Sequence, residues 1–169
     1  MTLRLILMRH AKSSWDDLMM SDHERPLNAR GRKAATAFGT WLKEQGFTPD
    51  QALCSTAQRT RETLERSVGA VDTKFLDGLY NASAHRILDV LQSHGTGQTV
   101  MLVAHNPGIA EFAESIVQTV PKHSGFMAYP SGATLVAEFE AESWKDLRLG
   151  TGAVQAFIVP RELTDLPAV

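Results

Sequence analysis

The sequence of 169 residues contains one cysteine, Cys54, so no intrachain disulfide bond can form. A single thiol also cannot build a cysteine-based metal cluster. Neither sign of charge dominates, because 17 Lys and Arg residues are balanced by 19 Asp and Glu residues, for a formal net charge of -2. A chain without a strong positive field is not expected to bind nucleic acid or an anionic membrane.

Long apolar runs are also lacking. The N-terminal run at residues 5–8 is too short for the hydrophobic region of a signal peptide or for a membrane span. We therefore expect a cytoplasmic protein. No internal repeat, low-complexity tract or Pro/Gly/Ser-rich linker divides the chain, so we expect residues 1–169 to form one domain.

What the sequence does contain is an alternation of apolar runs with helical periodicity. Strands are expected at residues 3–8, 52–54, 74–76, 99–104, 135–139 and 154–159, the last two paired near a sheet edge. Helices are expected at 28–45, from 55 or 56 onward, at 83–95 and from 106 to about 120, with a long loop at 12–27. The alternation predicts a three-layer α/β/α sandwich with a mostly parallel central sheet.

Capping residues mark the expected helix boundaries. Side chains able to cap a helix start, and glycines able to end one, occur at Asn28, Gly46, Ser55 or Thr56, Ser83 and Gly95. At the pair Asn106-Pro107 we expect an asparagine cap followed by a proline at the first helical position. The backbone N–H groups of that last helix would favour an anion at its start.

Cationic side chains and histidines follow the carboxyl ends of three predicted strands. Arg9 and His10 follow the first strand, Arg59 lies about one helical turn after the second, and His105 directly follows the fourth. Because a parallel sheet places its site outside these strand ends, we expect the four residues to meet. Arginines bind phosphate oxygens bidentately, and nearby cations lower the pKa of a histidine, which leaves it neutral. The pattern predicts phosphoryl transfer through a phosphohistidine.

Four sequence elements occur in an order that resembles the histidine phosphatase superfamily, the phosphoglycerate mutase-like proteins. They are Arg9-His10-Ala11 for its R-H-G motif, Pro26-Leu27-Asn28-Ala29-Arg30-Gly31 for P-L-T-x-x-G, Ser55 to Thr63 with Arg59 for S-x-x-x-R-x-x-x-T, and His105-Asn106-Pro107 for its second histidine. The D-x-x-R-P-L spacing from Asp22 to Leu27, the H-N-P form and the short chain are most similar to SixA-type phosphohistidine phosphatases.

The resemblance implies a phosphoglycerate mutase-like fold and a metal-independent phosphatase that needs no cofactor. His10 would be the phosphorylated nucleophile, with Arg9, Arg59 and His105 around the phosphoryl group. Ser13 and Asn106 are further expected substrate-binding residues. A metal site on the two histidines is disfavoured, because no carboxylate is spaced to complete it and the arginines would repel a cation.

The chain departs from the family pattern where many members carry a glutamic acid. Leu79-Tyr80-Asn81 stands at that place, and Asp77 and Asp16 are the nearest candidate acids. Imidazole, with a pKa of roughly 6.5, leaves far more easily than an alkoxide. We therefore expect protein phosphohistidine as the substrate. A phosphatase for a small metabolite phosphate ester, with Asp77 or Asp16 as acid, and a non-catalytic phosphate- or phosphoprotein-binding module are the alternatives. The oligomeric state is left open.

Other residues near these motifs are assigned to packing or to solvent. Arg25 is expected to be the one that reaches inward from its basic cluster, whereas Arg61 is expected to face solvent or to pair with Glu65. Lys12 has equal grounds for extending the positive rim and for being solvated. For Trp15, Met19 and Met20, packing over the domain edge is preferred to contact with a partner. His123 is a candidate for the pocket rim.

Overall fold

The computed structural model describes residues 1–163. Six strands form one sheet in the order β3-β2-β4-β1-β5-β6. The strands are β1 (Thr2–Arg9), β2 (Gln51–Ser55), β3 (Thr73–Leu76), β4 (Thr99–Ala104), β5 (Thr134–Glu140) and β6 (Ala153–Ile158). The helices are α1 (Ala29–Gln45), α2 (Gln58–Val68), α3 (Ala84–His94) and α4 (Gly108–Ile116). Among residues 1–163, no helix has the length and apolar composition needed to cross a membrane.

The sheet is mostly parallel, as the sequence predicts. Strands β3, β2, β4 and β1 pair in parallel, and β5 joins β1 and β6 through antiparallel pairing. In the β1–β4 ladder Arg9 lies opposite Ala104. His10 and His105, one residue further along each strand, therefore leave the sheet at the same level.

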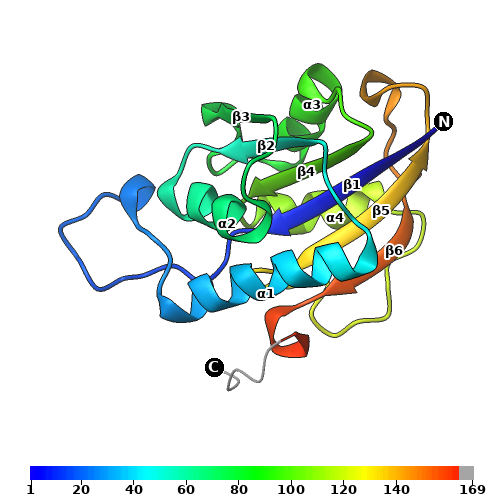
Figure 1. Cartoon of the computed structure of the whole chain (residues 1–169). Helices are drawn as coiled ribbons and strands as arrows, with labels where there is room; N and C mark the ends of the chain where they lie inside the picture. The colour runs from blue at the N-terminus through cyan, green and yellow to red at the C-terminus, as the bar shows by residue number, and fades with distance from the viewer. Residues whose placement is uncertain (164–169) are drawn as a thin grey trace.

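Helices cover both faces of the sheet, which confirms the three-layer sandwich (Figure 1). Successive residues of β1 point to opposite faces. Leu5 and Leu7 belong to the core that contains residues of α3 and α4, whereas Ile6 and Met8 belong to the core under α1 and α2. Burial on both faces explains why β1 is an unbroken apolar run, since each such side chain contributes about 1.5–3 kcal/mol when fully buried.

Four of the predicted helix boundaries are correct, at Asn28, Gly46, Ser83 and Gly95, the last of which directly follows α3. Asn28 precedes α1, and its side chain accepts a hydrogen bond from the N–H of Gly31 at 2.8 Å. Gly46 ends α1 in the left-handed conformation at φ 75°. Ser83 caps α3 by accepting from the N–H of Arg86.

Two predicted helix starts are wrong, because the expected caps bond elsewhere. Helix α2 begins at Gln58 without a side-chain cap; the Ser55 hydroxyl lies 2.8 Å from His105 Nε2, and Thr56 donates to Asp77. Helix α4 begins at Gly108 and ends at Ile116, four residues short of the expected end. The Asn106-Pro107 peptide bond is cis, and the Asn106 amide donates to the carbonyl oxygens of residues 128 and 129.

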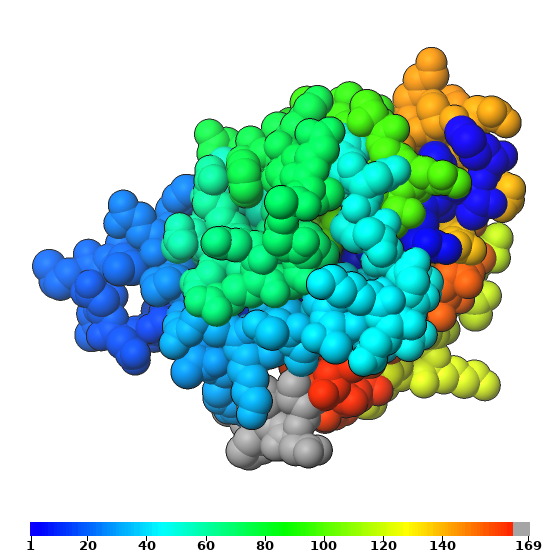
Figure 2. Space-filling view, in the orientation of Figure 1, coloured from blue at the N-terminus to red at the C-terminus, as the bar shows by residue number. Residues whose placement is uncertain are grey.

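The loop between β1 and α1 extends away from the body of the molecule (Figure 2). The expected packing of its apolar residues over the domain edge is wrong for Trp15 and Met19, both of which are exposed. Met20 is half-buried.

Candidate active site

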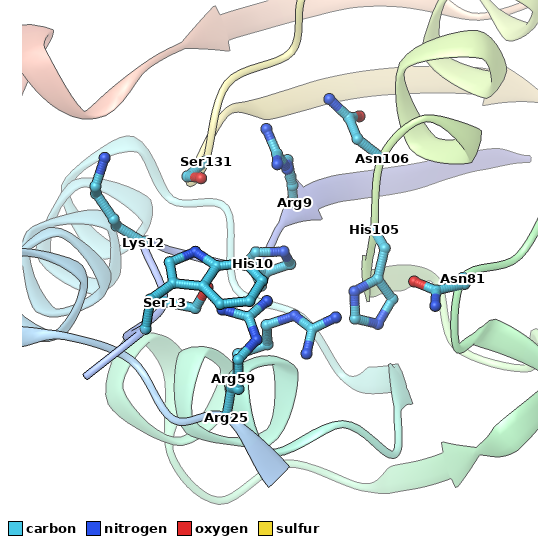
Figure 3. Close-up of a pocket in the computed structure, with 11 residues that line it drawn as sticks. Arg9, His10, Lys12, Ser13, Arg25, Arg59, Asn81, His105, Asn106 and Ser131 are labelled. Carbon is cyan, nitrogen blue, oxygen red and sulfur yellow. The ribbon is translucent and has the colours of Figure 1, made fainter. Parts of the chain in front are cut away.

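A cavity of about 300 Å³ lies at the carboxyl ends of β1 and β4 (Figure 3). Its lining includes all six residues expected from the sequence: Arg9, His10, Ser13, Arg59, His105 and Asn106. It also includes Lys12, Trp15, Arg25, Asn81 and Ser131. Arg25 reaches inward and Lys12 extends the positive rim. Asn81 and Ser131 were not predictable as site residues, because neither follows a predicted strand end with a distinctive pattern.

His10 is held from both sides by backbone hydrogen bonds. Its N–H donates to the carbonyl oxygen of Ala104 at 3.2 Å, and its carbonyl accepts from the N–H of Gly132 at 2.9 Å. In the side chain, Nδ1 lies 2.7 Å from the carbonyl oxygen of Ala11. A carbonyl can only accept, so Nδ1 carries the hydrogen and Nε2 keeps a free lone pair. Nε2 is therefore the atom able to act as a nucleophile.

The environment of His10 lowers its pKa to about 3. The largest cause is burial; Arg9, Arg59 and Arg25 lower it further, against the opposing effect of the bond to Ala11. The sequence predicts a lowered pKa from the neighbouring cations, whereas burial contributes more. Both effects keep the imidazole neutral at neutral pH.

His105 faces His10 across the cavity, with ring centroids 5.3 Å apart. Its Nε2 lies 2.8 Å from the hydroxyl of Ser55, a hydroxyl that already accepts from the N–H of Ala57 at 3.3 Å. The buried Ser55 hydroxyl has no other acceptor among residues 1–163, so it donates to Nε2, and the imidazole hydrogen is assigned to Nδ1. The pKa of His105 is lowered to about 3, chiefly by burial and then by His10 and Arg59.

Three arginines from separate segments converge beside the histidines. Arg59, from the first turn of α2, is buried and donates to both the backbone carbonyl and the carboxylate of Asp22, at 2.7 and 3.0 Å. Arg25 is also buried; it pairs with Asp22 at 3.1 Å and donates to Ser13 Oγ at 2.8 Å. Arg9 donates to the carbonyl oxygen of Tyr129 at 3.1 Å.

Asp22 and Tyr80 hold this arrangement, and the sequence analysis assigned a role to neither. Asp22 binds both Arg25 and Arg59 and accepts a hydrogen bond from the Tyr80 hydroxyl. The pKa of Asp22 falls to about 2, first because of the Tyr80 bond and then because of Arg59. The Asp22 bond in turn raises the pKa of Tyr80. The D-x-x-R-P-L spacing was a signal for Asp22, whereas Tyr80 lies 58 residues away in sequence.

Other motif residues position the backbone next to His10. The Thr63 hydroxyl accepts from the N–H of Ala11 at 3.0 Å and donates to the carbonyl of Arg59 at 2.7 Å. Helix α1 approaches the loop so closely that a Cβ at Gly31 would overlap the carbonyl oxygen of Lys12. The glycine at the end of the Pro26–Gly31 motif therefore has a steric basis in this chain.

Four buried polar atoms of the cavity residues have no hydrogen-bond partner. They are Arg9 Nε, Arg59 Nε, His105 Nδ1 and Asn106 Oδ1. No other side chain within residues 1–163 has such an atom. Buried polar atoms without partners are costly, and all of these except Asn106 Oδ1 are donors, so their concentration here indicates a site built for a ligand that accepts hydrogen bonds.

The candidate acids and several neighbouring residues lie outside the cavity. Asp16 is exposed, Asp77 accepts from Thr56 at 2.6 Å, and neither lines the cavity. The expected pairing of Arg61 with Glu65 is wrong, because its guanidinium donates to Thr56 O and lies over the ring of Phe75. His123 pairs with Glu162 instead of lining the rim. Within residues 1–163, no three His, Cys, Asp or Glu side chains are grouped so that they could hold a metal ion.

Comparisons with known proteins give the same family as the motifs. The family model described as the histidine phosphatase superfamily (branch 1) matches residues 5–82, a range that ends before His105. An uncharacterized protein from Mycobacterium tuberculosis strain H37Rv is 31% identical over 161 residues, which cover 91% of this chain and 100% of that relative. An uncharacterized chloroplastic protein from Arabidopsis thaliana is 35% identical over 127 residues, which are 67% of this chain and 58% of the relative's length.

The fold also matches solved structures. One from Nakamurella multipartitia, provisionally named phosphohistidine phosphatase SixA, superposes with a TM-score of 0.83 at 29% identity, over 95% of this chain and 97% of that chain. The chain belongs to the histidine phosphatase superfamily and has its phosphoglycerate mutase-like fold. This membership confirms the resemblance found in the sequence and supports a phosphatase as the class of enzyme.

Proposed function

We propose that the protein is a metal-independent phosphatase that removes phosphate from phosphohistidine on another protein, through a phosphorylated intermediate at His10. The observation that carries this proposal is the composition of the cavity. Three arginines line it together with two histidines, and both histidines have pKa values of about 3. None of the lining residues is a carboxylic acid. The provisional name of the Nakamurella relative supports the same substrate class.

The first half of the reaction transfers phosphate between two imidazoles. Nε2 of His10 attacks phosphorus while the P–N bond of the substrate breaks and its electron pair returns to the substrate ring. A substrate ring protonated at its other nitrogen leaves as neutral imidazole, whose conjugate acid has a pKa of roughly 6.5. Attacking and leaving groups are then of the same kind, so the protein need not supply a proton.

The second half releases phosphate from His10. Water attacks phosphorus, the P–N bond breaks toward Nε2, and the protons of the water remain with the inorganic phosphate. His10 leaves as neutral imidazole because Nδ1 has kept its hydrogen and its bond to Ala11 throughout. In both halves Arg9, Arg25 and Arg59 stabilise the phosphoryl oxygens, and Ser13, His105 and Asn106 offer further polar contacts.

An ester substrate would make a different demand on this site. Its alkoxide leaving group has to be protonated, and neither Asp77 nor Asp16 lines the cavity to do so. The composition of the cavity therefore supports phosphohistidine over a small metabolite ester. A neutral, oriented nucleophile at the centre of the site equally supports turnover over mere phosphate binding.

The decisive experiment compares substrates after treatment with EDTA. Turnover of a phosphohistidine-bearing protein is measured beside a panel of phosphate esters, with His10→Ala as the inactive variant and His85→Ala, an exposed histidine, as its matched control. We expect preference for phosphohistidine and an acid-labile phosphoenzyme, both lost only in His10→Ala. Preference for esters, together with loss of that activity in Asp77→Asn, would establish the ester reading. Failure to form any phosphoenzyme would show that the protein is a non-catalytic phosphate- or phosphoprotein-binding module.

A further inference from the structure

The loop between β1 and α1 presents large apolar side chains to solvent beside the cavity. Trp15 is 67% exposed, Leu18 86% and Met19 94%. The other exposed large apolar side chains within residues 1–163 are spread along the chain, at Met1, Phe75, Val120, Met127 and Leu149. Three such side chains within five residues exceed the scattered exposure that is ordinary on a protein surface.

The loop is firmly braced at its base. The N–H of Ser14 donates to the carbonyl of Pro26 at 2.8 Å, and the N–H of Asn28 donates to the carbonyl of Lys12 at 3.0 Å. At the tip, the N–H of Met19 donates to the Asp17 carboxylate at 3.0 Å. Figure 2 shows the loop standing off from the rest of the molecule. The apolar side chains are thus held out on an ordered support.

This apolar surface is continuous with the phosphate cavity. Trp15 lines the cavity, and its ring stacks on the guanidinium of Arg25 at 3.5 Å from the ring centroid. A protein ligand that places its phosphoryl group beside Arg25 therefore also reaches Trp15, the first residue of the exposed apolar set that Leu18 and Met19 continue.

The charge of the loop differs from that of the cavity. Asp16, Asp17 and Glu24 are exposed and form no ion pair with any other of residues 1–163, whereas the cavity is lined by Arg and Lys. Carboxylates at this place repel a small phosphorylated anion and attract a basic surface. The two charges together fit a phosphoryl group carried on a protein with basic residues around it.

We infer that residues 15–19 form a docking surface for the protein that carries the phosphohistidine, a partner whose surface beside that histidine is apolar and basic. The inference rests on the proposed function and adds the means by which the site selects a protein over free phosphohistidine. Trp15 contacts both the cavity and the partner, and Leu18 and Met19 contact the partner alone.

The test uses the double variant Leu18→Asn/Met19→Asn, which leaves every cavity residue unchanged. Leu149→Asn is the matched control, because Leu149 is 55% exposed and lies far from the cavity. The next residue, Gly150, donates its N–H to the carbonyl of Ser115, near the end of α4 that is remote from His105. The substrates are a panel of histidine phosphotransfer domains phosphorylated with phosphoramidate, and free phosphohistidine. We expect kcat/KM for the best protein substrate to fall at least tenfold in the double variant and that for free phosphohistidine to stay unchanged, with no change in the control.

A second variant tests the charge. Asp16→Lys/Glu24→Lys, which keeps the Asp17 carboxylate that braces the loop tip, should lower kcat/KM for the protein substrate, and added salt should reduce the difference from wild type. Equal losses on both substrates, or no loss on either, would overturn the docking surface alone. So would a wild-type dimer in sedimentation that Leu18→Asn/Met19→Asn converts to a monomer, because the surface would then bind a second copy. Wild-type protein that hydrolyses neither substrate would overturn the proposed function, and the docking surface with it.

Discussion

At the scale of single residues, one backbone carbonyl decides the chemistry of His10. The carbonyl of Ala11 fixes the hydrogen on Nδ1, and burial keeps the ring from taking a second proton. The sequence could identify His10, because it directly follows a strand and an arginine. It could not give the tautomer, which depends on a backbone geometry that no residue type encodes.

We predict that neither His10 nor His105 titrates in the usual range of histidine. Their pKa values of about 3 lie far below the value of roughly 6.5 for an exposed imidazole, because burial and neighbouring cations disfavour the charged form. Ring 15N chemical shifts of the two residues, followed by NMR from pH 8 to pH 5, should stay at their neutral values. A midpoint near pH 6.5 for His10 would contradict the described electrostatics.

We predict that Asp22 positions the arginines instead of binding substrate. In Asp22→Asn the cavity becomes more cationic, so KM for free phosphohistidine should stay unchanged or fall. The two guanidinium groups lose their shared anchor, and kcat should drop by about tenfold or more, as misplacement by a fraction of an ångström commonly causes. Steady-state kinetics beside Asp72→Asn, an exposed carboxylate elsewhere, separates this effect from a general loss of charge. A raised KM with unchanged kcat would refute the positioning role.

At the scale of elements, apolar periodicity was sufficient to locate all six strands and four helices. Helix starts were predictable only where the capping side chain had no other partner, as at Asn28 and Ser83. Where the side chain bonds to a residue of the site, as Ser55 does with His105, the preference for a capping residue does not predict where the helix begins. The errors in helix boundaries therefore fall on residues next to the cavity: the Ser55 hydroxyl accepts from the N–H of Ala57, ahead of the helix, and lies 2.8 Å from His105 Nε2 instead of capping α2.

We predict that close packing of α1 on the loop makes Gly31 necessary. In Gly31→Ala the added methyl group meets the carbonyl of Lys12, two residues from His10. Overpacking of this kind typically lowers the free energy of unfolding by about 1–3 kcal/mol, and here it should also lower kcat. Urea denaturation and turnover would be compared with Gly78→Ala, where the added Cβ meets no atom within 4 Å. Equal behaviour of the two variants would show that the loop can move aside.

At the scale of the whole molecule, the cavity follows from sheet register. The β1–β4 pairing aligns Arg9 with Ala104, and β2 pairs with β4 at Cys54 and Val103, which brings Ser55 to the level of Ala104, one residue before His105. The convergence of Arg9, His10, Arg59 and His105 was predictable from this topology. The contacts of Asp22 with Arg59 and Tyr80 were not, because Asp22 lies in the connection between β1 and α1, whose path in space is not fixed by strand order.

We predict that acid destabilises the fold partly through these two histidines. Folded His10 and His105 resist protonation until about pH 3, whereas the unfolded chain takes up protons below about pH 6.5. Their contribution to the free energy of unfolding is therefore fully present above pH 6.5 and declines as pH falls toward 3. Each unit of pKa difference corresponds to about 1.4 kcal/mol. Denaturation between pH 7 and pH 4 should show a flatter decline in His10→Gln/His105→Gln; an identical decline would contradict the linkage.

Tyr129 has a consequence for the order in which the protein becomes active. Its hydroxyl bonds to the carbonyl of Leu7 in β1 and to the N–H of Leu135 in β5, while its own carbonyl accepts from Arg9 and Asn106. The N-terminal arginine of the site is thus oriented by a segment more than a hundred residues later. A chain growing on the ribosome acquires His10, Arg59 and His105 early, yet its active centre stays incomplete until β5 has emerged and joined β1. We therefore expect a chain that ends before β5 to lack the oriented Arg9 that the complete site contains.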